Sequence, residues 1–233
     1  MLHFCICFMM VLVCACLVSC SSSPATKGSD FIGNYPSQKI ETVMINSVSE
    51  KKNELNPLEI SYVLYPRKNT VEINMIYEMY HVTLTLSQTN RTEMLSSMQN
   101  YIDDYQAGKL GKENDRKKAF FGQTTIPMMW GLLSTSSYAK VPIYFEYRQI
   151  SDKRPYFLFT CDMIPATDSN GAILKNGMVT PPLKLAFSPL QCQHVIEVLN
   201  QDALVKIVSD LDTEQSKFDI PEATASDEPN VMF

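Results

Sequence analysis

Four short segments between residues 39 and 86 alternate apolar and polar residues, and this period of two constrains the fold more than any other feature. The clearest example is residues 81–86 (HVTLTL), where Val82, Leu84 and Leu86 share one face and polar side chains share the other. Strands with one polar face are typical of antiparallel sheets, because parallel strands are usually buried on both faces. The predicted strands are residues 39–46, 58–66, 70–80 and 81–86.

An amphipathic helix is predicted directly after the fourth strand, starting at Ser87 or Thr89, either of which can cap it. Its apolar residues recur every three or four positions and form one stripe. They are Met94, Leu95, Met98, Tyr101, Ile102 and Tyr105. A polar run at residues 109–118 follows the helix, so the globular region divides into halves at residues 39–111 and 112–211.

The second half shows the same order of elements. Strands are predicted at residues 119–133 (interrupted by Pro127), 141–150, 155–164 and 183–187, followed by a helix at 188–200 whose extension to 211 is open. A shift of 101 residues places Ser87 on Ser188. This match has two explanations. The chain contains a duplicated β-β-β-β-α unit, or the match arises because any amphipathic strand followed by an amphipathic helix would align in this way. The predicted fold class is α+β, a mostly antiparallel sheet with two amphipathic helices.

The predicted order of elements resembles that of Pur-alpha-like and Whirly-like folds. The resemblance rests on that order alone, without a shared motif, so no function follows from it. A formal net charge of −5 argues against a protein that tracks nucleic-acid phosphates. Six acidic residues against Lys217 in the tail, residues 212–233, account for the whole net charge and leave the body neutral. The tail is predicted to be disordered.

The first twenty residues contain an uncharged apolar stretch at residues 4–18, which is too short to span a bilayer but suits a signal peptide. It ends in Leu17-Val18-Ser19-Cys20, and this resembles the lipobox of bacterial lipoproteins. The resemblance implies that residues 1–19 are removed as a signal peptide. It also implies that Cys20 is alkylated with diacylglycerol and acylated, which gives a stable anchor of about three acyl tails. The absence of Lys and Arg before the apolar stretch departs from the family pattern.

The residues after the lipobox bear on location. Residues 20–38 mix Ser, Pro and Gly with a single Lys and are predicted to form a lipidated tether. In the enteric lipoprotein pattern that the sequence resembles, Asp after the lipidated Cys retains the protein in the inner membrane. Because Ser21 stands there, the resemblance implies an outer-membrane protein that faces the periplasm.

The sequence contains no recognisable catalytic, metal or cofactor motif. None of its 8 glycines belongs to a G-x-G-x-x-G, a P-loop or a G-x-S-x-G pattern. His81 and His194 do not stand at metal-ligand spacing, and Asp168 to Gly171 predicts a turn rather than a calcium loop. We therefore predict no catalytic residues, no metal ligands and no cofactor.

Two cysteines remain in the mature body, Cys161 and Cys192. Both fall on predicted apolar faces and could meet in the core. Export permits a disulfide between them, but two buried free thiols fit the same pattern. Both alternatives stay open.

The segment around Met128, Met129 and Trp130 shows no clear alternation and contains the single tryptophan of the chain. It is either part of the core or an exposed contact for a partner or lipid, because large apolar clusters in irregular segments can form binding patches.

Together these features predict a membrane-anchored bacterial envelope lipoprotein that is a binding or assembly module and not an enzyme. Its expected partners are the lipid bilayer, through acylated Cys20, and an envelope protein. An envelope enzyme with a dispersed site is the alternative. Nucleic-acid binding of the Pur-alpha-like kind is opposed by the charge and by export.

Overall fold

The computed structural model describes residues 30–49, 54–111, 120–132, 136–150, 154–168, 170–175 and 177–218 of the 233 residues. The predicted signal peptide, Cys20 and the first part of the tether lie outside the described residues. The strands are β1 (Gln38–Ser49), β2 (Glu54–Tyr65), β3 (Thr70–Tyr77), β4 (Tyr80–Leu86), β5 (Phe120–Gly131), β6 (Ser137–Ile150), β7 (Arg154–Thr160) and β8 (Lys184–Phe187). The helices are α2 (Gln88–Gln106), α3 (Pro189–Leu199) and α4 (Gln201–Phe218).

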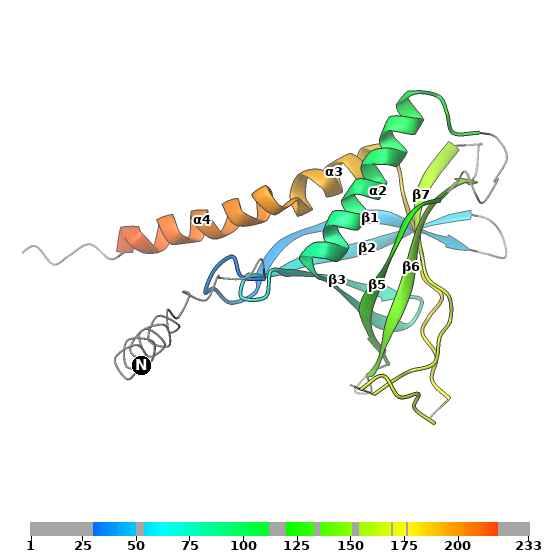
Figure 1. Cartoon of the computed structure of the whole chain (residues 1–233), viewed down its shortest axis with the longest axis horizontal. Helices are drawn as coiled ribbons and strands as arrows, with labels where there is room; N and C mark the ends of the chain where they lie inside the picture. Colours follow the sequence, from blue (N-terminus) through cyan, green and yellow to red (C-terminus); the bar gives the residue numbers. More distant parts are fainter. Residues whose placement is uncertain are drawn as a thin grey trace, which may run out of the picture.

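The eight strands form one closed barrel in sequence order, and every neighbouring pair is antiparallel. The mostly antiparallel α+β fold is therefore confirmed, while closure of the sheet was not predicted. Helices α2 and α3 lie together against the strands, and α4 projects away from the barrel (Figure 1). None of the described helices is long and apolar enough to cross a bilayer.

The order of described elements is four strands and a helix, twice, followed by α4. Within each half, most consecutive strands pair over six or more residues, such as the β1–β2 ladder from Gln38 to Ser49, while β7 and β8 pair over four. The halves meet at two short seams. The β4–β5 seam has four residue pairs, and the β8–β1 seam has two, Asn46 with Ala186 and Ser47 with Leu185.

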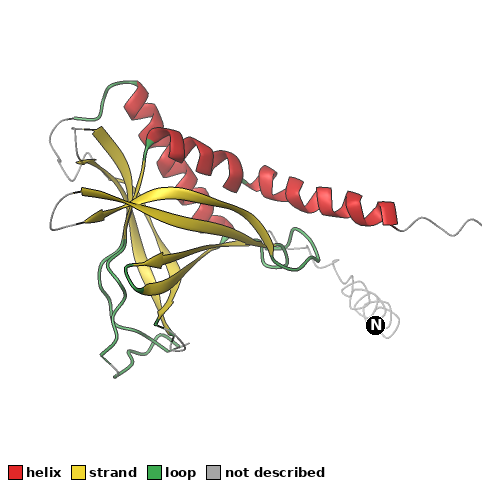
Figure 2. Ribbon diagram, turned by 180° about the vertical axis from the view of Figure 1, so that it is seen from behind, coloured by secondary structure: helices red, strands yellow, loops and turns green. Residues whose placement is uncertain are grey.

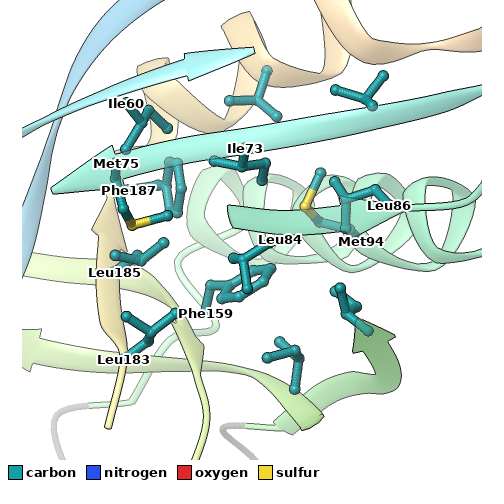
Figure 3. Packing of buried hydrophobic residues seen from close by; sticks show 14 of the residues in the cluster. Ile60, Ile73, Met75, Leu84, Leu86, Met94, Phe159, Leu183, Leu185 and Phe187 are labelled. Atoms are coloured by element: carbon teal, nitrogen blue, oxygen red, sulfur yellow. The ribbon is translucent and has the colours of Figure 1, made fainter. Parts of the chain in front are cut away.

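The core fills the inside of the barrel and the space beneath the helices. Alternation places the inward residues of β3, β4 and β8 in one core cluster with residues of α2, and Figure 3 shows Leu84 and Leu185 in this cluster together with Met94 of the helix. Aromatic rings pack together in the core, where the ring centroid of Tyr101 lies 5.9 Å from that of Phe121 and 5.6 Å from that of Phe157. The hydroxyl of Tyr101 donates to a backbone carbonyl at 2.9 Å, so its polar end is also satisfied.

Helices α2 and α3 begin with the same local structure. Ser87 caps α2, its Oγ accepts from the backbone N–H of Asn90, and the Asn90 side chain accepts from the backbone N–H of Ser87. Ser188 and Gln191 form the same reciprocal pair at the start of α3. These capping boxes satisfy N–H groups that a helix start otherwise leaves free. They also lie 101 residues apart, in the register of the sequence match.

The same two side chains reach the strand that follows each seam. Asn90 Nδ2 donates to the backbone oxygen of Thr125 in β5 at 3.1 Å, and Gln191 Nε2 donates to that of Met44 in β1 at 2.8 Å. Thr125 and Met44 lie just before the residues where β5 and β1 pair with β4 and β8. Each capping residue therefore ties its helix to the first strand of the other half.

The C-terminal helix corrects one expectation. Residues 201–211 form a separate helix that runs on to Phe218, so the first seven residues of the predicted disordered tail are helical. The separation occurs at Asn200, whose Nδ2 donates to the carbonyl of Ile196 at the end of α3 while its Oδ1 accepts from Ala203 at the start of α4. Residues 219–233 lie outside the described residues.

The tether is also shorter than expected. Its last part packs on α4 and the β2–β3 turn: Ile32 N donates to Pro66 O at 3.0 Å, and Tyr35 Oη donates to Asp212 Oδ1. A Cβ at Gly33 would collide with Cγ1 of Val208, so the backbone approaches α4 closely there. Residues 30–37 are therefore part of the folded domain.

Candidate functional site

One row of outward-facing side chains crosses six neighbouring strands. Cross-strand pairs join its members in the order Thr42, Ser61, Asn74, Thr83, Met129 and Tyr138. We call these six residues the outer row. Thr83 Oγ1 donates to Asn74 Oδ1 at 2.7 Å, which fixes both side chains on the surface of the sheet. Hydroxyl and amide groups of this kind offer donors and acceptors to a partner without a net charge.

A groove of about 460 Å³ lies along the outer row over β2, β3 and β4. Pro57, Leu58 and Ile76 line both this groove and a second hollow of about 630 Å³ between β1, β2 and the end of β3. A third hollow of about 320 Å³ over β6, β7 and β8 shares Lys184 with the second. We call the three together the outer groove. It winds over the outside of the barrel, away from the core that the helices cover.

The outer groove combines a small acidic excess, four carboxylates against Arg148 and Lys184, with exposed apolar side chains. In the third hollow Arg148 Nη2 lies 3.6 Å from Glu146 Oε1, so its cation is offset locally. Ile76 lines the first two hollows and is 59% exposed, while Met44 and Met129 beside them are 54% and 48% exposed. Methionine adapts its shape to a partner. This surface suits binding by shape and hydrogen bonds rather than by a long-range field.

The predicted partner-contact segment divides between core and surface. β5 is a regular strand here, so Met128 and Trp130 face inward, are 0% and 1% exposed, and cannot meet a partner. Only Met129, between them, faces outward, as a member of the outer row. The alternation was hidden because an apolar residue stands on both faces of the strand.

Cys161 and Cys192 are both buried and free, so the structure contains no disulfide between them. Burial raises the pKa of the Cys161 thiol to about 11, and it raises the pKa of Cys192 further. A thiol with a raised pKa remains protonated at neutral pH and reacts slowly. The two cysteines therefore act as apolar core residues.

The two histidines have separate surroundings. His81 is exposed on the rim of the outer groove, and the Nε2 atom of His194 lies 3.0 Å from Glu41 Oε2. Asp168 Oδ1 accepts from the backbone N–H groups of Asn170 and Ala172, which is the geometry of a turn. The described residues contain no group of three or more His, Cys, Asp and Glu side chains that could hold a metal.

Arg91 is the buried residue that sequence reasoning missed. Its side chain is 2% exposed at the start of α2, and its two terminal nitrogens donate to Asn69 O at 2.7 Å, Asn69 Oδ1 at 2.8 Å and Gln201 Oε1 at 2.9 Å. It thereby ties α2 and α4 to the β2–β3 turn. Burial, which removes water from the guanidinium, lowers its pKa to about 10. Its place in a polar run of the helix gave no signal.

Comparison with known proteins places this architecture in a family. Residues 37–206 match the model of the family described as "Uncharacterised Treponema protein". The chain belongs to this Treponema family. The matched residues start just before β1 and end within α4, so they include the barrel, α2, α3, the outer row and Arg91.

One relative extends the likeness beyond the family match. An uncharacterized protein of Treponema pallidum (strain Nichols) is 28% identical over 220 residues, which cover 93% of this chain and 76% of the relative. No solved structure matches the chain. The comparisons therefore relate this chain to other proteins by sequence, and the barrel described above gives the fold of this member of the family.

Proposed function

We propose that this member of the Treponema family is a lipid-anchored, non-catalytic binding or assembly module of the bacterial cell envelope. The observation that supports it most directly is the outer groove, an open surface in which the hydroxyl and amide groups of the outer row lie beside exposed Met44, Ile76 and Met129. Shallow surfaces of this composition bind extended partners, whereas small-molecule sites are enclosed and mostly apolar.

The proposed membrane anchor is acylated Cys20. This anchor is supported by the lipobox sequence and by membership of a family from a bacterial genus. Cys20→Ser should abolish labelling by a clickable palmitate analogue and leave a heavier, unprocessed precursor. Ser22→Ala, which leaves the lipobox intact, is the control and should label normally. Equal labelling of wild type and Cys20→Ser would show that the chain is not a lipoprotein.

The proposed location is the outer membrane, with the domain in the periplasm, because Ser21 follows the anchor residue. Density-gradient fractions should therefore contain the protein together with outer-membrane markers. Ser21→Asp should move it toward inner-membrane fractions. Recovery of the wild type with inner-membrane markers would contradict the location and leave the anchor proposal intact.

The binding role can be tested by photo-crosslinking from single positions. A photoreactive amino acid at Ser61 or Thr83, in the outer row, should capture an envelope component in living cells. The matched control is Ser96, an exposed serine on α2 outside the groove. The same crosslinked bands from Ser61 and Ser96 would contradict a partner in the outer groove. An enzyme with a dispersed site would give no macromolecular crosslink from any of the three.

We also propose that the barrel arose by duplication of a β-β-β-β-α unit. It is supported by the two capping boxes at Ser87 and Ser188 and by their matching contacts with Thr125 and Met44. In both halves the capping residue contacts the first strand of the other half, next to the seam where the two halves pair. Chance likeness between an amphipathic strand and helix explains none of these contacts across the halves.

A further inference from the structure

The tether enters the fold beside one particular turn. Ile32 N donates to Pro66 O in the turn between β2 and β3, so the chain that comes from Cys20 must pass this turn. Nine residues lie between Cys20 and Asp30, where the described segment begins, so ten residue steps join the two. Fully extended, ten residues span at most about 35 Å. A bilayer that holds Cys20 therefore lies within that reach of Asp30, at the pole where the β2–β3 turn is found (Figure 1).

The tip of the β2–β3 turn is basic. Arg67 and Lys68 are both exposed there, and no acidic side chain of the described residues forms an ion pair with either. Backbone bonds from Lys68 N to Tyr65 O at 3.1 Å and from Asn69 N to Pro66 O fix the turn. Asn69, at φ 47°, is held from below by Arg91. The two cations therefore stand on a rigid support.

The neighbouring helix has the opposite charge. Among the described side chains α4 carries Asp202, Asp210, Asp212 and Glu214 against Lys206. Figure 2 shows α4 leaving the barrel on the side where the tether and the β2–β3 turn lie. An anionic membrane surface would attract the turn and repel the helix. Because α4 leaves the barrel on the same side as the turn, its acidic side chains oppose part of this attraction, and the tip of the turn is a basic surface at this pole that can contact the bilayer.

We propose that the β2–β3 turn, through Arg67 and Lys68, contacts the phosphate headgroups of the bilayer that holds acylated Cys20. The inference rests on the proposed lipid anchor and adds a second, electrostatic contact to it. The short tether keeps the turn at high effective concentration near the surface, so a weak attraction is sufficient. Each cation near an anionic leaflet contributes roughly fivefold to the occupancy of the contact.

The contact can be measured through lysine chemistry on the lipidated chain. The protein is inserted from outside into vesicles of phosphatidylethanolamine and phosphatidylglycerol, pulsed with an amine-acylating reagent and analysed by mass spectrometry. Acylation of Lys68 should slow at least about fivefold relative to the same protein in neutral detergent micelles. Lys140, exposed on β6, is the internal control and should react at the same rate in both. High salt should restore the Lys68 rate, because it screens exposed charges.

A charge-reversal variant separates electrostatic contact from simple crowding. Arg67→Glu should return Lys68 to its rate in micelles, while Lys140→Gln should leave the protection of Lys68 unchanged. Before the pulse, intact mass establishes that each sample carries its lipid acyl chains on Cys20. A sample without acyl chains would refute the proposed anchor itself. An acylated sample in which Lys68 reacts as fast in vesicles as in micelles would overturn the contact alone. Protection that survives in Arg67→Glu would overturn it as well.

Discussion

A buried cation normally has an acidic partner, and Arg91 has neutral oxygens instead. The penalty of desolvation appears in its pKa, which burial lowers to about 10. Hydrogen bonds offset this penalty, because one planar guanidinium donates to acceptors in the β2–β3 turn and on the first residue of α4. Three elements that are distant in sequence therefore meet on a single side chain.

Replacing Arg91 should test this arrangement. Arg91→Met removes the donors to the two buried acceptors of Asn69, at about 1–3 kcal/mol each, while Gln201 Oε1 keeps a hydrogen bond from Asn69 Nδ2. The relief of a buried charge offsets part of this loss, so the free energy of unfolding should fall by about 3 kcal/mol. Arg91→Lys keeps the charge but cannot fill all the acceptors, and it should destabilise nearly as much. Urea unfolding measures both, and an unchanged midpoint for either would contradict the role.

The buried thiols make a second residue-scale prediction. Burial raises the pKa of Cys161 from 9.0 to about 11, so the thiol ionises in the unfolded chain before it does in the folded one. Its contribution to stability is complete below pH 9 and is lost as the pH rises toward 11. Over that window the wild type should lose about 2 kcal/mol more than Cys161→Ala, measured by urea unfolding in reductant.

A thiol count provides the control on redox state. A chain that starts at residue 20 and carries Cys20→Ser should show no reactive thiol when folded, because Cys161 and Cys192 are buried. In denaturant without reductant it should show both. Absence of free thiols in denaturant would contradict the structure and indicate a disulfide.

At the scale of elements, the two capping residues should stabilise the fold by similar amounts, although Asn90 Nδ2 also donates to Thr124 Oγ1 at 2.7 Å. Asn90→Ala and Gln191→Ala each remove a side chain that closes a capping box and bonds a strand of the other half. Each should lower the free energy of unfolding by about 1–2 kcal/mol. Gln193→Ala, whose side chain bonds only Glu197 on the exposed face of α3, is the control and should cost less than about 0.5 kcal/mol. A loss at only one of the two positions would contradict this expectation.

Across the whole molecule, the local patterns were predictable and the long-range pairings were not. Alternation at residues 81–86 and the helical stripe after Ser87 gave β4 and α2 because both signals lie within a few residues. Barrel closure depends on the pairing of β1 with β8, and no local pattern specifies it. The extent of α4 was missed because residues 30–37 cover it from far away in the chain.

The candidate site was less predictable than the fold. The outer row consists mostly of Ser, Thr and Asn residues that occur on any solvated strand, and only strand register aligns them. Trp130 was a candidate contact residue because it is the single tryptophan of the chain, yet its side chain is buried in the core. Met129 was predicted as a contact because it belongs to a run of large apolar residues. It is exposed because strand alternation turns it outward between inward-facing Met128 and Trp130.

The brevity of the β8–β1 seam has a consequence for folding kinetics. Most ladders within each half join strands that are close in sequence, and such local contacts form early because they close short loops. The seam instead joins Ser47 to Leu185, so almost the whole domain must be ordered before its two residue pairs can form. We expect the barrel to close last at this seam, and unfolding to begin there. Amide hydrogens at Asn46 and Leu185 should therefore exchange faster than those in the middle of the β5–β6 ladder.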